Sequence, residues 1–270
     1  NARGGSILNN NITTTLDNGF GVYSYLNGNK IISNNIVNTT GTSSYGIYVF
    51  NLTTKHSYGL KENDIFTAAS LIKLPVILTL YQQAESEQMN LDGKYVLREQ
   101  DKRPGAGSLQ YQPAGKTFSY RQLAELMGQQ SDNTAFMVLR RILTDVKIQA
   151  TIDSLGMSKT SLTKNETTPA DIGLLFRKLY GGSIVSREHR DEILSFLTKT
   201  AFEDRIPAGV PGGVKVAHKI GNEIGVFSDA GIVLTEKPFV LVIMSKNALE
   251  REAKEALPAI TRAVWEFENK

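Results

Sequence analysis

The sequence contains no cysteine, which excludes disulfides, thiolate metal sites and a cysteine nucleophile. Its three histidines lie far apart and lack the spacing of a histidine metal site. No apolar run approaches the ~20 residues that a membrane-spanning helix needs. Lysines and arginines are scattered, and the net charge of +3 indicates no nucleic-acid surface. We therefore expect no metal, no cofactor, no membrane span and no nucleic-acid partner.

The composition that remains is that of an ordinary globular protein, with 41% hydrophobic and 21% charged residues in a chain of 270. Such a chain can bury a core without covalent staples. No signal peptide is recognisable after Asn1. We expect an exported protein, periplasmic or secreted, whose leader is not part of this sequence, and we expect it to be a monomer.

Residues 1–43 differ from the rest because they are rich in Asn, Thr, Ser and Gly and almost free of charge. They also repeat: the run at 7–12 returns at 31–36, and the run at 19–25 returns at 44–50. Short strands with Asn pairs at the corners are typical of parallel β-helix coils, in which asparagine amides can stack. The alternative is an Asn-rich tail whose internal similarity is accidental.

The order of the remaining elements predicts the fold class. Residues 44–60 have the pattern of a β-hairpin, residues 66–200 that of successive helices, and residues 213–247 that of three strands before a final helix at 250–267. This order predicts an α/β (α+β) protein with an antiparallel sheet built from both chain ends and flanked by helices. The predicted domains are the repeat segment 1–43, the sheet domain 44–65 with 201–270, and the inserted helical domain 66–200.

One short motif in the helical region suggests chemistry. Ser70 opens an apolar helical run, and Lys73 follows at the i+3 position, where the two side chains share one face. A serine at a helix N-terminus beside an amine can act as a nucleophile. Ser-x-x-Lys is a common pattern, however, and a serine N-cap followed by a surface lysine would explain it equally.

Two further motifs follow in order, Ser131-Asp132-Asn133 and Lys219-Ile220-Gly221. Together with Ser70-Leu71-Ile72-Lys73 they resemble the penicillin-recognising serine hydrolases, and within them the class A β-lactamase family. The resemblance extends from about residue 44 to residue 270.

The resemblance implies a role for each matching residue. Ser70 would attack the carbonyl of a β-lactam or a peptidoglycan peptide, with Lys73 as proton acceptor or relay. Ser131 would protonate the leaving nitrogen, and Asn133 would bind the substrate amide. Lys219 would attract a carboxylate, and Gly221 would leave room for substrate along the strand edge. The backbone N–H groups of Ser70 and Asn222 would form the oxyanion hole.

Outside these motifs, three residues need a weighed interpretation. Asp132 is expected to tie down its loop rather than catalyse, and His218 to pack or hydrogen-bond. Arg205 fits either a second cation for a carboxylate or a surface ion pair.

The sequence departs from the family pattern at two places. Ile220 replaces a hydroxyl residue that helps to bind the substrate carboxylate, at a cost of ~1.5–3 kcal/mol. The loop before Thr167 is short, and its only glutamate is Glu166. Glu166 is either the deacylation base or a helix-start carboxylate. We therefore expect a β-lactamase with slow deacylation. The alternatives are a D-alanyl-D-alanine carboxypeptidase, esterase or penicillin-binding protein, and a non-catalytic cell-wall binding protein.

Overall fold

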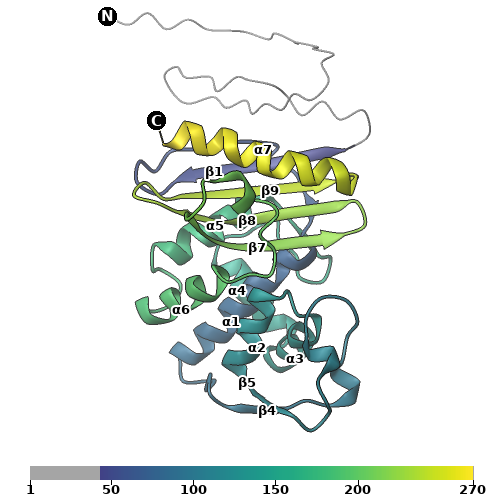
Figure 1. Ribbon diagram of the computed structural model, residues 1–270. Helices are drawn as coiled ribbons and strands as arrows, with labels where there is room; N and C mark the ends of the chain where they lie inside the picture. The colour runs from purple at the N-terminus through teal and green to yellow at the C-terminus, as the bar shows by residue number, and fades with distance from the viewer. Residues whose placement is uncertain (1–42, 270) are drawn as a thin grey trace, which may run out of the picture.

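The structure is a computed structural model, and it describes residues 43–269. The β-helix coils predicted for the N-terminal segment lie outside the described residues, apart from Ser43. Two layers of helices enclose one central sheet, and a helical lobe extends from one side of it (Figure 1). The main strands are β1 (Ser44–Asn51), β2 (Ser57–Leu60), β7 (Lys215–Glu223), β8 (Val226–Leu234) and β9 (Phe239–Lys246). The helices are α1 (Lys73–Glu85), α2 (Tyr120–Gln129), α3 (Asn133–Leu143), α4 (Asp145–Ser154), α5 (Pro169–Tyr180), α6 (Arg187–Leu197) and α7 (Glu250–Glu268).

The central sheet confirms the predicted fold class. Its strand order is β2-β1-β9-β8-β7, and every neighbouring pair is antiparallel. The N-terminal hairpin therefore pairs with the last strand, β9, with Ser44 opposite Lys246 and Asn51 opposite Phe239. Strand β7 lies at one edge of the sheet. Strand β7, which carries Lys219, therefore has a strand neighbour on one side only within the described chain.

Alternation along β1 assigns the two faces of the sheet. Ile47 and Val49 belong to a core with helix α7, whereas Tyr48 and Phe50 belong to the larger core shared with the helical lobe. The two-residue period follows from the pleat of a strand. In Figure 1, α7 covers the outer face and α5 lies on the other. Gly173 allows this close approach, because a Cβ there would lie 2.2 Å from the Tyr48 ring.

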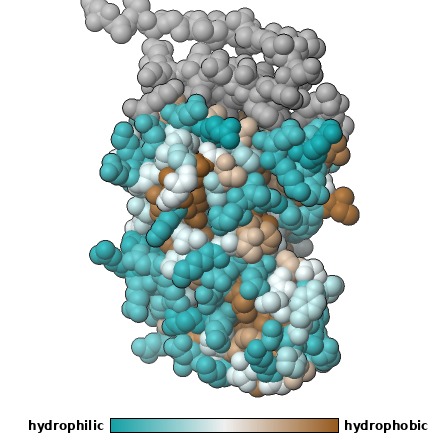
Figure 2. Space-filling view, in the orientation of Figure 1, coloured by the Kyte–Doolittle hydropathy of each residue, from teal (hydrophilic) through white to brown (hydrophobic). Residues whose placement is uncertain are grey.

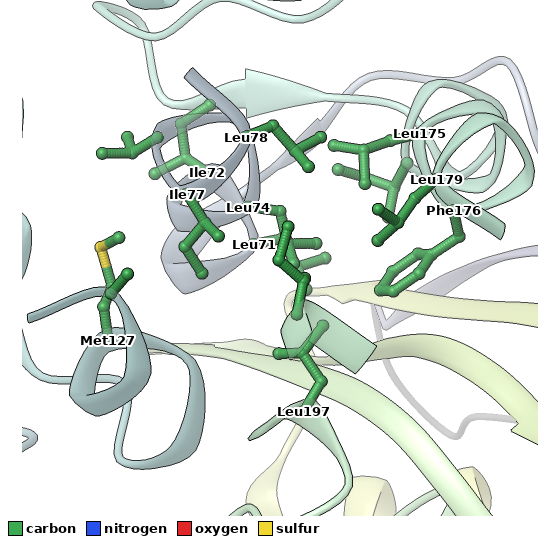
Figure 3. Close-up of a cluster of buried hydrophobic side chains, with 14 of the residues drawn as sticks. Leu71, Ile72, Leu74, Ile77, Leu78, Met127, Leu175, Phe176, Leu179 and Leu197 are labelled. Atoms are coloured by element: carbon green, nitrogen blue, oxygen red, sulfur yellow. The ribbon is translucent and has the colours of Figure 1, made fainter. Parts of the chain in front are cut away.

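Helix α1 is the centre of the helical lobe. Nine consecutive residues, 73–81, are buried, so the helix has no solvent face in its first two turns. Leu74, Ile77 and Leu78 meet side chains from α2 and α5 around it (Figure 3). The start of α1 is thereby held rigidly against the sheet, which positions the Ser-x-x-Lys motif.

The prediction that the middle of the chain is helical throughout was wrong in detail. Four short strands occur there, and they pair in two small sheets, β3 with β6 and β4 with β5. The strands are β3 (Phe66–Thr67), β4 (Lys94–Val96), β5 (Thr117–Ser119) and β6 (Glu166–Thr167). Strands of two or three residues are too short to produce a recognisable period in the sequence.

The face drawn in Figure 2 is mostly hydrophilic, and its apolar groups lie in separate patches. Within the described part of the chain, no helix has both the length and the apolar character needed to cross a bilayer.

Candidate active site

Ser70 lies in a tight turn between the helical lobe and the sheet edge. It belongs to the 3-10 helix η1 (Ala69–Ile72), which leads directly into α1. The preceding residue, Ala69, has a positive φ of 46°, a strained conformation for a residue with a side chain. The Ser70 side chain is half-buried, and its hydroxyl has no hydrogen-bond partner among residues 43–269. The hydroxyl is therefore not committed to a structural bond.

Gly221 of strand β7 packs directly against this turn. A Cβ at Gly221 would lie 3.0 Å from the Ala68 carbonyl oxygen and 3.3 Å from Leu71 Cγ. The glycine thus allows the edge strand to approach the turn that carries Ser70. This close packing is a structural reason for the glycine in addition to the predicted space for substrate.

Lys73 is the first residue of α1, and its ammonium group is buried among neutral acceptors. Nζ donates to the Ser131 carbonyl oxygen at 2.5 Å, to Asn133 Oδ1 at 2.7 Å and to Ser131 Oγ at 3.2 Å. Burial lowers the pKa of Lys73 to about 8, and the nearby charge of Asp132 opposes this shift only partly. No carboxylate accepts a hydrogen bond from Lys73 in the described chain. A neutral, basic amine is therefore accessible near physiological pH.

The Ser131-Asp132-Asn133 motif is fixed by the cap of helix α3. Ser131 has a positive φ of 56°. Asp132 Oδ1 caps the helix by accepting from the Ala135 N–H at 2.8 Å, and Oδ2 accepts from the Leu109 N–H at 2.9 Å. This confirms that Asp132 ties down its loop.

Asn133 is oriented by the loop before helix α3. Its Nδ2 donates to the Pro104 carbonyl at 2.9 Å, which turns Oδ1 toward Lys73. One side of the amide therefore faces Lys73.

Lys219 completes the site from the edge strand β7. Its side chain is 1% exposed, and Nζ donates to Ser131 Oγ at 2.8 Å and to the Ile220 carbonyl at 3.0 Å. Burial, and next the charge of Lys73, lower the pKa of Lys219 well below its usual value. The structure thus brings two lysines, from opposite lobes, onto one serine hydroxyl.

Arg205 forms hydrogen bonds with strands β7 and β8 close to Lys219. It is buried, and it donates to the Ser228 carbonyl at 2.6 Å and to Asn222 Oδ1 at 2.5 Å. Burial lowers the pKa of Arg205, although the charge of Asp229 opposes that shift. Arg205 is therefore buried rather than at the surface, and its one ion pair in the described chain, with the exposed Asp204, is long at 3.9 Å. It holds Asn222, whose N–H is the predicted oxyanion donor.

His218 lies in the core behind Lys219. It is fully buried, with Nδ1 2.8 Å from Asp229 Oδ1 and Nε2 2.8 Å from Thr200 Oγ1. The prediction that His218 hydrogen-bonds is confirmed. Its two partners, Thr200 and Asp229, could not be predicted from the sequence, because they are 18 and 11 residues away.

Glu166 lies close to the nucleophile turn but bonds to none of the predicted site residues. In strand β6 it is opposite Thr67 of β3, three residues before Ser70. Both side chains are partly exposed, whereas Phe66 and Thr167 on the other face are buried. The helix-start carboxylate of α5 is Asp171, in the first turn after the Thr168 cap, and not Glu166. That structural explanation for Glu166 was therefore wrong.

Asn165, which the sequence did not single out, contacts both sides of the site. Its carbonyl accepts from the Ala68 N–H at 2.8 Å, and its Nδ2 donates to Glu223 Oε1 at 2.9 Å. Its φ of 55° is in the left-handed region, which asparagine tolerates better than most residues. The only sequence feature that could have indicated this role is an asparagine directly before the short strand β6.

A sheet of this order, a helical lobe and a Ser–Lys–Ser–Lys arrangement at their junction define a penicillin-recognising serine hydrolase of the class A β-lactamase type. The chain belongs to the Beta-lactamase enzyme family, which residues 30–267 match. It is 20% identical to Beta-lactamase VEB-1 from Pseudomonas aeruginosa over 252 residues, 82% of this chain and 84% of that protein.

Solved structures give the same assignment. A β-lactamase from Sphaerobacter thermophilus DSM 20745 is 26% identical with a TM-score of 0.81, covering 84% of this chain and 92% of that one. A point mutant of PBP-A, solved as an acyl-enzyme complex with penicillin G, is 29% identical with a TM-score of 0.79, covering 86% and 92%.

Proposed function

We propose that the protein is a serine hydrolase that β-lactams acylate at Ser70 and that releases the acyl group slowly. The observation that carries this proposal is the hydroxyl of Ser131, shared by Lys73 at 3.2 Å and Lys219 at 2.8 Å. Two buried amines beside one hydroxyl form a path for protons between a nucleophile and a leaving group. The free hydroxyl of Ser70, one turn from Lys73, supplies the nucleophile.

Acylation then follows a balanced sequence of proton transfers. Neutral Lys73 takes the proton of Ser70 as Oγ bonds to the lactam carbonyl carbon. The N–H groups of Ser70 and Asn222 stabilise the oxyanion. The C–N bond breaks as Ser131 donates its proton to the nitrogen, and Lys73 returns a proton to Ser131 through their hydrogen bond. Lys219 holds the Ser131 hydroxyl in place and contributes positive potential toward a substrate carboxylate, while Asn133 receives the substrate amide.

Deacylation is the slow step in this proposal. We assign Glu166 as its base, because its side chain lies on the exposed face of the small sheet beside Thr67. A general base must reach its water within hydrogen-bond distance. Glu166 forms no hydrogen bond with Lys73 or Ser131. We therefore propose that it assists hydrolysis of the acyl-enzyme, but that this hydrolysis is slow. Ile220 affects the earlier step, because it offers no hydroxyl to an anionic substrate and so weakens its recognition before acylation.

A second function on the same scaffold is a D-alanyl-D-alanine carboxypeptidase, esterase or penicillin-binding protein. The absence of a carboxylate among the hydrogen-bond partners of Lys73 in the described chain favours it, as does the likeness to PBP-A, whose mutant forms an acyl-enzyme with penicillin G. A non-catalytic cell-wall protein remains the alternative outside enzymes. In each case we propose a monomer that is exported to the periplasm or secreted.

Intact mass spectrometry after a penicillin pulse tests the proposal. We expect a mass increase equal to one penicillin, absent in Ser70→Ala, that decays over minutes or longer. Nitrocefin turnover would indicate lactamase activity. Turnover of a D-Ala-D-Ala peptide or thioester without nitrocefin turnover would favour the second function. No adduct with any β-lactam, on a protein that circular dichroism shows to be folded, would refute acylation at Ser70.

A further inference from the structure

A pocket lies at the end of the sheet where the first hairpin turns. It has a volume of about 270 Å³, and residues of β1, the following turn, α5 and the segment after α5 line it. Its lining contains none of the predicted active-site residues. It is therefore a separate cavity from the Ser70 site.

The wall of this pocket is apolar. Phe50 and Leu52 are buried members of the larger core, and Leu174 and Tyr180 on α5 complete the wall. An apolar cavity of about 150 Å³ is large enough to bind benzene, so a volume of about 270 Å³ has room for a larger apolar group. An alkyl chain of about eight carbons, or one aromatic ring with a short chain, matches this size.

The charged side chains at the pocket are all of one sign. Lys55, Arg177 and Lys178 line it, and no aspartate or glutamate does. None of the three forms an ion pair with any residue in the range 43–269. Basic residues in the last turn of a helix stabilise its dipole, which explains Arg177 and Lys178 in part. That reason does not apply to Lys55, which lies in the turn between β1 and β2.

Arg177 is held in place before any ligand arrives. Its guanidinium carbon lies 3.7 Å from the centroid of the Phe50 ring, and Nη1 donates to Tyr48 Oη at 3.0 Å. Lys55 is held too, because its Nζ donates to the Leu52 carbonyl at 2.6 Å. Stacking on an aromatic ring leaves the edge of a guanidinium free to bind a carboxylate or phosphate with two hydrogen bonds. Fixed cations at an apolar cavity lose little entropy on binding.

We propose that this pocket binds an amphiphilic anion, with the apolar chain along Leu52, Leu174 and Tyr180 and the anionic head group at Arg177. The ligand class is a medium-chain carboxylate or a lipid with an anionic head group. Both present the same chemistry, a carboxylate or phosphate joined to an alkyl chain.

Isothermal titration calorimetry with octanoate tests the pocket directly. We expect octanoate to bind at least tenfold more tightly than acetate, which lacks the chain, and than octyl glucoside, which lacks the charge. Arg177→Gln should weaken octanoate binding at least fivefold, whereas Arg187→Gln should not. Arg187 is a suitable control because its side chain is 87% exposed on the neighbouring helix α6. The double substitution Lys55→Gln with Lys178→Gln keeps the stacked arginine and should also weaken binding.

Two further measurements decide the source of the ligand and separate this pocket from the Ser70 site. Sedimentation with phosphatidylglycerol vesicles, but not with phosphatidylcholine vesicles, would identify a lipid head group; octanoate binding without sedimentation would identify a free amphiphile. Saturating octanoate should leave the penicillin adduct at Ser70 unchanged, so failure of either proposal can be recognised separately. Equal binding of acetate and octanoate, or octanoate binding unaffected by all three pocket substitutions, would overturn the assignment.

Discussion

Lys219 Nζ lies 2.8 Å from the hydroxyl oxygen of Ser131, and Lys73 Nζ contacts the same oxygen at 3.2 Å. The two amines come from opposite lobes, one from the start of α1 and one from the edge strand β7. Two buried ammonium groups this close to one hydroxyl repel each other, and burial disfavours both charges. The pair therefore titrates as a coupled unit. One neutral amine near neutral pH is the expected result.

This coupling predicts the pH dependence of acylation. Burial lowers the pKa of Lys73 to about 8, and only the neutral amine can accept the Ser70 proton. The second-order rate of acylation by a penicillin should therefore rise with pH, about tenfold per unit well below pH 8, and level off above it. Stopped-flow labelling with a fluorescent penicillin between pH 5.5 and 9.5 measures the profile. A rate that is flat or falls over this range would contradict Lys73 as the base.

Asp132 is predicted to carry much of the stability of the site. It is fully buried, caps α3 through the Ala135 N–H and accepts from the Leu109 N–H. Asp132→Ala removes the cap, worth ~1 kcal/mol, and leaves a buried N–H unpaired at ~1–3 kcal/mol. We expect the free energy of unfolding in urea to fall by about 2–4 kcal/mol, with slower labelling of Ser70.

The control for Asp132 is Asp153→Ala on α4. Asp153 is exposed and accepts only a surface hydrogen bond from Gln149. Its substitution should change the unfolding free energy by less than ~0.5 kcal/mol. A similarly small change in Asp132→Ala would mean that the loop is held by other contacts.

Much of the fold follows from patterns in the sequence that extend over many residues. The hairpin at 44–60 and the three strands after residue 213 have alternation and β-branched residues, and the sheet contains them in the predicted antiparallel arrangement. Ser119, directly before helix α2, caps that helix by accepting from the Gln122 N–H. These features depend on local periodicity and capping, which sequence records directly.

The remaining features depend on contacts between distant residues. Arg205 is buried because strand β8 supplies a carbonyl at Ser228, 23 residues away, and nothing in its neighbours indicates this. Asn165 meets Ala68 and Glu223 from two other elements. The pocket at Arg177 needs Phe50, 127 positions earlier in the chain, beneath the guanidinium. Such arrangements are properties of packing and leave no period in the sequence.

Ile220 offers a gain-of-function prediction. It is buried in β7 opposite Asp229, and it lacks the hydroxyl that the family uses for a substrate carboxylate. Ile220→Thr should raise the rate of acylation by penicillins roughly ten- to a hundredfold, because a hydrogen bond to a charged group contributes ~1.5–3 kcal/mol. The protein should also lose about 1 kcal/mol of stability from the reduced buried volume.

Ile220→Val is the matched control for this change, because it has the β-branch without the hydroxyl. Its acylation rate should remain within about twofold of the parent, and its stability should fall by ~0.5–1.5 kcal/mol. Labelling kinetics with penicillin G and thermal unfolding measure the two effects. If threonine and valine behave alike toward penicillin, the residue at this position does not limit carboxylate recognition.

Glu166 is the base that we propose for deacylation. Its backbone pairs with that of Thr67, three residues before Ser70, and its carboxylate makes no hydrogen bond with Lys73. If it activates the hydrolytic water from this position, Glu166→Gln should lengthen the lifetime of the acyl-enzyme at least tenfold while the rate of acylation stays the same. A well-placed general base accelerates a reaction by about 10²–10⁴-fold. A smaller effect of Glu166→Gln on deacylation would indicate a base that is not ideally placed. A pulse of penicillin followed by intact mass spectrometry over hours separates the two steps.

Glu62→Gln supplies the comparison, since Glu62 is another half-exposed glutamate close to the start of α5, where the Glu62 carbonyl accepts from the Ala170 N–H at 2.9 Å. Its removal should leave both acylation and deacylation unchanged. Equal acyl-enzyme lifetimes for the parent and Glu166→Gln would remove Glu166 from the mechanism. Water would then reach the ester without help from a carboxylate at this position. If the adduct is also long-lived, the main consequence of acylating Ser70 is penicillin binding rather than lactam turnover.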